Sequence, residues 1–186
     1  MQVFPRSWEW AVYDPLVGSS MLELGNKRKN TFIYKNFFQE RGFRHVSVDT
    51  NGLDGALRLD LRKPLNLGTF DMVTNIGTSE HVSEDAWDGQ VACWRNILEA
   101  MHVGSVLVSI GPEQGAWPNH GTWYPQPPFF HELARLNGLE VERCYASEHG
   151  THPNQRQVYA RLVGREDVPF QMTAVGMYKN NRLQKR

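Results

Sequence analysis

The sequence predicts an α/β fold built on a doubly wound, mostly parallel sheet with helices on both faces. Between Met21 and Val163, short apolar runs alternate with amphipathic helical patterns, the order expected of strands joined by crossover helices. The first run stops at Gly25 and a later one stops at Gly111-Pro112, as buried strands do at their turns. A chain of 186 residues is long enough for one sizeable core. We therefore expect a single domain over residues 1–186.

Apolar spacing places the individual elements along this domain. Helices are expected where apolar side chains recur at about one helical turn: after Gly25, from Trp87 to Met101, and from Pro127 to Leu136. Gly104 is expected to separate the second helix from the strand after it. Strands are expected at residues 21–24, 45–48, 70–74, 106–110, 139–145 and 157–163.

The two ends of the chain differ from this alternating core, which we place at residues 19–163. Residues 1–18 are rich in aromatic side chains and predict an N-terminal cap, and residues 164–186 predict a C-terminal extension that frays from Tyr178. No apolar run approaches the roughly 20 residues that span a bilayer, and the start lacks the pattern of a signal peptide. We expect a cytoplasmic protein, in the host cytoplasm if the gene is viral, with no membrane partner.

The charge balance indicates which class of partner to expect, and the cysteines indicate the redox compartment. Twenty basic residues balance twenty acidic ones, so the chain lacks the basic excess with which proteins grip nucleic acids. This favours a small-molecule partner and leaves the oligomeric state undetermined. Cys93 and Cys144 have neither metal nor redox spacing, which predicts two core-filling thiols in a reducing compartment.

The carboxyl ends of the predicted strands are where an open α/β sheet binds its ligand. Gly25 ends the first strand, and Asp49 ends the second at about the distance at which nucleoside-binding folds place a carboxylate for the ribose hydroxyls. The alternative is structural: Gly25 caps a turn and Asp49 caps a helix.

Four segments in register resemble the motifs of class I S-adenosylmethionine-dependent methyltransferases. MLELG resembles the first motif, SVDTNG the ribose-binding end of the second strand, RLDL the motif beside adenine, and FDMVTNIGTSEHV the fourth-strand motif. The resemblance extends roughly from Ser19 to Val163. It implies a seven-stranded sheet and S-adenosylmethionine as cofactor, with S-adenosylhomocysteine as product.

The resemblance also implies roles for single residues. Those that would contact the cofactor are Glu23, Gly25 and Asn26 at its methionine end, Asp49 at the ribose, Asp60 and Leu61 at the adenine, and Asn75 at the end of the fourth strand. One departure is that GNKRKN replaces the usual glycine-rich run. The missing glycines argue against a dinucleotide, because its pyrophosphate needs a close backbone approach.

Two histidines are candidate general bases, since histidine titrates near neutral pH. His81 follows the fourth strand near the position where the family's reactive methyl lies, and the alternative is a helix-start residue bonded to the backbone. His120, in the long segment after the fifth strand, is the second candidate. Glu80-His81 also resembles a Glu-x-x-Glu-His metal pattern, but Gly77 replaces its first glutamate. On that ground we expect no metal.

The irregular segment after the fifth strand holds the candidate acceptor contacts Trp117, Trp123 and Tyr124. These aromatic residues could form a lid over the acceptor or a satellite core under a loop, and we favour the lid. Ile76-Gly77 follows Asn75 where nucleic-acid amino-methyltransferases have a Pro-Pro-aromatic run, which disfavours that activity. The sequence thus predicts in-line methyl transfer to a small-molecule or glycan-like acceptor. The alternatives are an S-adenosylmethionine-cleaving enzyme on the same fold and a non-catalytic cofactor-binding module.

Overall fold

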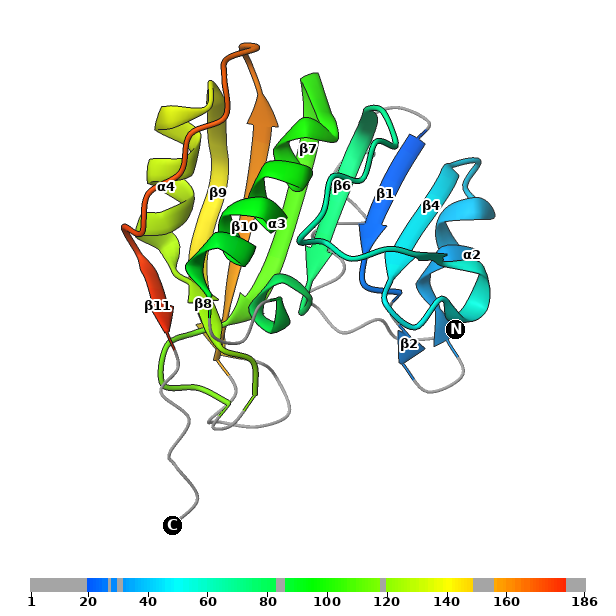
Figure 1. The fold of residues 1–186 in the computed structure, drawn as a ribbon, viewed down its shortest axis with the longest axis horizontal. Coiled ribbons are helices and arrows are strands. Elements are labelled where there is room, and N and C mark those ends of the chain that lie inside the picture. The colour runs from blue at the N-terminus through cyan, green and yellow to red at the C-terminus, as the bar shows by residue number, and fades with distance from the viewer. Residues whose placement is uncertain are drawn as a thin grey trace.

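The computed structural model describes most of the expected core and part of the C-terminal extension (Figure 1). The expected aromatic cap at residues 1–18 and the chain end at residues 180–186 lie outside the described residues. None of the helices described is long and apolar enough to cross a membrane. The ranges described are 20–26, 28–29, 32–82, 86–117, 120–148 and 156–179.

A seven-stranded sheet forms the centre of the molecule, in the order β5-β4-β1-β6-β7-β10-β9. All neighbouring pairs from β5 to β7 are parallel, whereas β10 runs antiparallel to both of its neighbours. This confirms the predicted doubly wound, mostly parallel sheet of seven strands. The strands are β1 (Ser20–Leu24), β4 (Arg44–Asp49), β5 (Leu57–Arg58), β6 (Phe70–Ile76), β7 (Met101–Pro112), β9 (Leu139–Glu148) and β10 (Arg156–Gly164).

The strand order reverses beside β1, which pairs with β4 on one side and with β6 on the other. Glu23 lies in register with Ser47 of β4 and with Thr74 of β6. The parallel strands end at the lower edge of the sheet in Figure 1, where the short strands β2 (Arg28–Lys29) and β8 (Trp123–Pro125) also lie. A ligand of an open α/β sheet binds at such an edge.

Helices pack on both faces of the sheet. The helix α3 (Trp87–Glu99) crosses the front face in Figure 1. Its Trp94 ring packs edge-on against two rings of α4 (Pro127–Leu136), with its centre 4.8 Å from that of Phe129 and 5.9 Å from that of Phe130. On the opposite face, Phe38 of α2 (Tyr34–Gln39) stacks on His45 of β4 at 6.1 Å. Side chains alternate between the two faces along a strand, so β1 supplies Leu22 and Leu24 to the α3 face.

Two boundaries differ from the sequence prediction. The second helix ends at Glu99 rather than Met101, and β7 starts at Met101 and runs through Gly104, whose φ is 90°. The reason is that Ser105 donates a hydrogen bond of 2.7 Å to the carbonyl of Phe70 and holds this irregular start of β7 against β6.

The predicted fraying from Tyr178 is also wrong for the first two residues of that stretch. Tyr178 and Lys179 belong to β11 (Met177–Lys179), which pairs antiparallel with β8. Periodicity did not predict this strand, because an isolated strand of three residues leaves no repeating pattern in the sequence.

Candidate functional site

A cavity of about 750 Å³ opens at the carboxyl ends of β1, β4 and β6. Its volume falls in the range of small-molecule and cofactor sites, roughly 300–1,000 Å³. Five residues predicted to be functional line it: Gly25, Asp49, Asp60, Leu61 and His81. Residues that were not predicted to contact a ligand complete the wall, namely Val48, Thr50, Leu59, Arg62, Gly77, Thr78, Val82 and Ala86.

Gly25 forms the turn at the end of β1 and has a left-handed φ of 71°. Its backbone N–H donates a hydrogen bond of 2.8 Å to the carbonyl of Val48. The side chain of Thr78 occupies the space into which a β-carbon at Gly25 would project. Both the backbone angle and this close approach therefore require glycine.

Asp49 ends β4 at the cavity, and its two carboxylate oxygens organise the loops around it. The backbone N–H of Asn51 donates to Oδ1 at 2.9 Å, and that of Asn26 donates to Oδ2 at 3.2 Å. A carboxylate oxygen has room for a second donor, so both oxygens can still accept from a ligand. The Asn26 side chain donates to the carbonyl of Leu53 at 2.8 Å and is not part of the cavity wall. It therefore shapes the loop, and its contact with the cofactor stays a prediction.

Asp60 is paired with Arg62, a wall residue that the sequence did not single out. The guanidinium donates to the Asp60 carboxylate from Nε and from Nη2, with a shortest distance of 2.6 Å. Chiefly through this hydrogen bond, Arg62 lowers the pKa of Asp60 to about 2. Asp60 is therefore an anion at any physiological pH.

Glu23 and Asn75, also expected to contact the cofactor, do not line the cavity. Glu23 is 3% exposed, and its Oε2 lies 3.0 Å from Nε2 of His45 on the α2 face. The Asn75 amide donates to the hydroxyls of Ser79 at 2.8 Å and Ser109 at 3.0 Å. The geometry assigns both side chains to packing between strands and gives no support to a direct contact with the cofactor.

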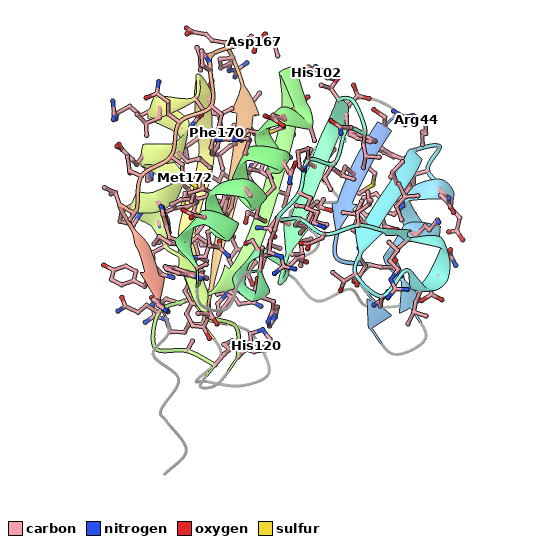
Figure 2. All side chains as sticks on the ribbon, in the orientation of Figure 1. Arg44, His102, His120, Asp167, Phe170 and Met172 are labelled. Carbon is pink, nitrogen blue, oxygen red and sulfur yellow. The ribbon has the colours of Figure 1, made fainter. Side chains whose placement is uncertain are left out.

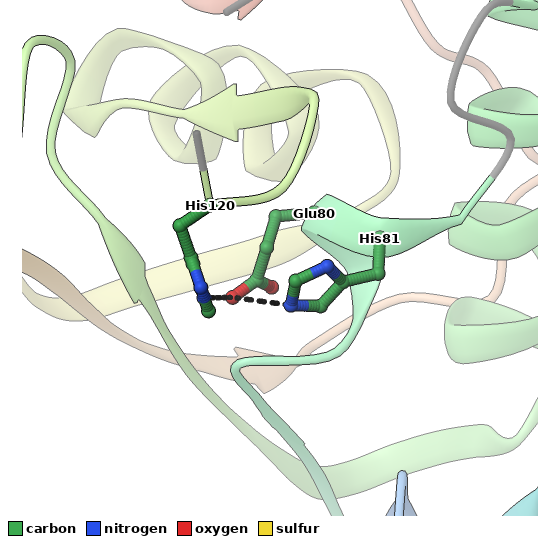
Figure 3. Close-up of side chains that lie close together, drawn as sticks. All are labelled: Glu80, His81 and His120. Carbon is green, nitrogen blue, oxygen red and sulfur yellow. Dashed lines mark ion pairs between the residues drawn. The ribbon is translucent and has the colours of Figure 1, made fainter. Parts of the chain in front are cut away.

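Both candidate bases lie beside one buried carboxylate (Figure 3). Glu80 is 2% exposed, and its Oε1 lies 3.9 Å from Nε2 of His81 and 3.6 Å from Nε2 of His120. The two imidazole rings meet edge to face with their centres 4.6 Å apart. Their side chains are 45% and 37% exposed, so the cluster joins a buried carboxylate to a solvent-accessible surface beside the cavity.

Backbone contacts fix the cluster in place. Glu80 and His81 belong to the short 3-10 turn η2 (Ser79–His81), and the backbone N–H of Thr122 donates to the Glu80 carbonyl at 2.7 Å. Gly121 has a φ of 39°, and a β-carbon there would lie 2.7 Å from Cγ of Glu80. From α3, the Gln90 amide donates to the carbonyl of Ser79 at 2.8 Å. The sequence could not show that His120 lies beside Glu80 and His81, because His120 belongs to a different loop.

The aromatic segment does not form the open lid that we expected. Trp123 is 9% exposed and packs against Trp87, with ring centres 5.6 Å apart, and Tyr124 is 1% exposed. The Tyr124 hydroxyl donates to the carbonyls of His120 at 2.6 Å and Trp117 at 3.0 Å. At these two positions the satellite-core alternative is correct. Trp117 is partly exposed, lies 4.9 Å from the His120 ring and stays a candidate acceptor contact.

The strand order, the antiparallel β10 and the cavity at the switch point together define the class I methyltransferase fold. No protein-family model matches the chain, and no curated protein matches it by sequence. The resemblance to known proteins is therefore a resemblance of structure.

Three solved structures represent that resemblance. The 1,6-didemethyltoxoflavin-N1-methyltransferase of Burkholderia thailandensis, with bound 1,6-didemethyltoxoflavin and S-adenosylhomocysteine, has a TM-score of 0.61 at 13% identity over 80% of this chain and 72% of that one. A TehB-like methyltransferase of Corynebacterium glutamicum has a TM-score of 0.59 at 16% identity, over 88% of this chain and 89% of that one. The glycopeptide N-methyltransferase MtfA with S-adenosylmethionine has a TM-score of 0.59 at 14% identity, over 86% of this chain and 93% of that one.

Proposed function

We propose that the protein is an S-adenosylmethionine-dependent methyltransferase that acts on a small-molecule or glycan-like acceptor. The observation that carries this proposal is the shared cavity: the Gly25 turn, the Asp49 carboxylate and His81 line one space at the ends of three adjacent strands. Solved structures of the same fold are methyltransferases crystallised with S-adenosylmethionine or S-adenosylhomocysteine.

The residues present fit this cofactor. Gly25 lines the cavity at the end of β1, where the methionine end of the ligand would lie. Asp49 offers carboxylate oxygens to the two ribose hydroxyls. Asp60 and Leu61 stand farther along the same wall, where the adenine would lie. The cavity is also large enough for a nucleoside ligand.

The chain's own residues would position the acceptor and take its proton. The cofactor supplies a methyl group on a sulfonium, which an acceptor atom displaces in line. We assign the proton transfer to His81, because it lines the cavity and also faces Glu80. An imidazole in this place can accept a proton from a hydroxyl or ammonium acceptor.

The acceptor would approach over the exposed edges of His81 and His120, beside Trp117. This surface carries an aromatic ring next to polar groups, which suits a heterocycle or a sugar. Proteins of this fold include one crystallised with 1,6-didemethyltoxoflavin and one named as a glycopeptide N-methyltransferase, which supports a heterocyclic or a glycan-bearing acceptor.

Calorimetric titration with S-adenosylhomocysteine tests the cofactor assignment before any acceptor is known. Hydrogen bonds to a charged group contribute roughly 1.5–3 kcal/mol, and a factor of ten in affinity is about 1.4 kcal/mol. Asp49→Ala should therefore weaken binding by roughly 10- to 100-fold. Because Asp49 also accepts from Asn26 and Asn51, Asp49→Asn serves as a milder variant, which can retain one loop contact without the charge.

Asp167→Ala is the matched control, since Asp167 is exposed at the opposite edge of the sheet (Figure 2). Its affinity and melting temperature should equal those of the wild type. Failure of the wild type to bind S-adenosylmethionine or S-adenosylhomocysteine at millimolar concentration would overturn the proposal. Equal binding by wild type and both Asp49 variants would remove Asp49 from the site.

Product analysis separates methyl transfer from the rival activity on this fold. Incubation with S-adenosylmethionine and candidate acceptors should release S-adenosylhomocysteine only when an acceptor is present. Another cofactor fragment, released without an acceptor, would identify a cofactor-cleaving enzyme instead.

A further inference from the structure

We propose that Glu80, His81 and His120 form a binding site for a divalent transition-metal ion of the zinc class. The three ligand atoms would be Oε1 of Glu80 and Nε2 of each histidine, and these donors lie within 4.8 Å of one another. The sequence argument against a metal rested on Gly77 in one motif and on the lack of a metal-type cysteine spacing. It could not include His120, which the fold brings in from the loop after β7.

The distances between the donors fit a metal ion better than a hydrogen bond. Glu80 Oε1 lies 3.6 Å from His120 Nε2 and 3.9 Å from His81 Nε2, beyond the 2.7–3.2 Å of a nitrogen–oxygen hydrogen bond. Metal bonds of about 2.0–2.1 Å place the ligand atoms of a tetrahedral site about 3.3 Å apart. Small rotations of the two partly exposed imidazoles would close the remaining gap.

The buried carboxylate of Glu80 is an independent observation that points to a ligand. Its Oε1 is shielded from solvent and accepts no hydrogen bond among the described residues, although it faces both imidazoles. A buried carboxylate is costly unless a cation or several donors compensate it. A divalent ion between the three side chains would supply that compensation.

The cluster is also built rigidly enough to hold an ion. Gly121 lets the loop lie directly against Glu80, and Thr122 donates to the Glu80 carbonyl. The buried Tyr124 hydroxyl holds the carbonyl of His120 at 2.6 Å. Two ligands on one turn and a third on a braced loop provide the preorganisation that metal sites require.

Two imidazoles and one carboxylate are the donor set of open zinc and non-haem iron sites, in which three protein ligands leave positions for water or substrate. Here the open positions would face the cavity, because His81 is part of its wall.

The consequence of this metal site for catalysis rests on the proposed function. An acceptor hydroxyl bound to the metal would lose its proton to solvent, and its oxygen would take the methyl, giving the methyl ether, S-adenosylhomocysteine and one proton. In the metal-loaded protein the ion, rather than free His81, would activate the acceptor.

Titration of the chelator-treated, tag-free chain with Zn²⁺ by calorimetry tests the site directly. We expect one strong site in the wild type, and at least a tenfold loss of affinity in Glu80→Gln, His81→Ala and His120→Ala. Co²⁺ in place of Zn²⁺ adds a second readout, because its visible absorption reports the number and geometry of ligands. Glu80→Gln preserves the shape of the buried side chain, and the half-exposed His120 can be shortened with little effect on the core.

His102→Ala is the matched control. His102 also lies beside a carboxylate, 3.2 Å from Asp71, but at the opposite edge of the sheet (Figure 2), and no third donor of the described residues joins that pair. Its Zn²⁺ titration should equal that of the wild type. Equal affinity in the wild type and all three cluster variants, or no strong binding by the wild type, would overturn the metal site.

Titration with S-adenosylhomocysteine keeps this outcome separate from the proposed function. Zn²⁺ binding without cofactor binding would retain the metal site and reject the methyltransferase. Cofactor binding without Zn²⁺ binding would do the reverse, and His81 would then act on the acceptor directly.

Discussion

The hydroxyl of Thr78 donates a hydrogen bond of 2.7 Å to the carbonyl oxygen of Leu24. This bond joins the turn after β6 to the last residue of β1, at the point where the strand order reverses. The cavity wall at this point is therefore a single unit made from two strand ends, and its geometry depends on the absence of a side chain at Gly25.

Gly25→Ala should reduce both stability and cofactor affinity. The added methyl group would collide with Thr78, and the φ of 71° is unfavourable for alanine. We expect a loss of roughly 1–3 kcal/mol in the free energy of unfolding and a clear loss of S-adenosylhomocysteine binding.

Gly42→Ala separates the collision with a neighbour from the cost of the backbone angle, because Gly42 has a φ of 83° and open space around it. It should show the backbone cost alone, with cofactor affinity unchanged. The double variant Gly25→Ala, Thr78→Ala should recover part of the loss. Equal effects of Gly25→Ala and Gly42→Ala would argue against the close approach.

Asp60 should contribute a pH-dependent increment of stability. Its pKa falls from 3.8 to about 2 in the folded protein, so the contribution is present above pH 3.8 and is lost as the pH falls through 2. The pair with Arg62 is largely exposed, so the effect is small.

Melting temperatures of wild type and Asp60→Asn, measured from pH 7 down to pH 2, should differ by a constant amount above pH 5 and converge in acid. Asp167→Asn is the control for general charge effects. A difference that widens toward pH 2 would contradict the assigned pairing.

Trp123→Ala should destabilise the protein far more than Trp117→Ala. Removing a buried tryptophan costs about 3–5 kcal/mol, and Trp123 packs in the same core as α3 and α4. Trp117 is partly exposed, so its removal should cost about 1 kcal/mol or less. Denaturant unfolding of both variants measures this. Similar stability of the two variants would restore the lid interpretation for Trp123.

The two cysteines should resist alkylation in the native protein. Burial, together with the nearby Glu80 carboxylate, raises the pKa of the Cys93 thiol well above its usual range, and burial raises that of Cys144 to about 11. Because the thiolate is the reactive form, iodoacetamide at pH 8 should label neither residue until denaturant is added. With rising pH, Cys144 should react first. Rapid native labelling of Cys93 would show that α3 opens readily.

Most of the fold could be predicted because its signals are local. The apolar spacing from Trp87 onward gives α3, and the β-rich run at residues 106–110 gives the centre of β7. The boundary between them could not be predicted, because the hydrogen bond from Ser105 to Phe70 joins residues far apart in the chain. Strand β11 depends in the same way on its pairing with β8.

The candidate site likewise contains residues that the sequence could predict and contacts that it could not. Gly25 and Asp49 could be predicted because Gly25 directly follows β1 and Asp49 is the last residue of β4, and a position at a strand end is readable from sequence. The cluster of Glu80 with His120 was not predictable, since it depends on the loop after β7 folding back onto η2. The pairing of Glu23 with His45 was not predictable either, because no sequence pattern shows that these two residues lie side by side.

Strand β11 has a practical consequence for any experiment on this protein. It returns the chain from Gly164 to the edge where β8 lies, and Lys179 stands 5.6 Å over the ring of Trp123. A polyhistidine tag joined directly to Lys179 would start from the edge of the sheet where β8 and His120 lie and would compete for the same ions, so an amino-terminal or cleavable tag is the better choice for purification.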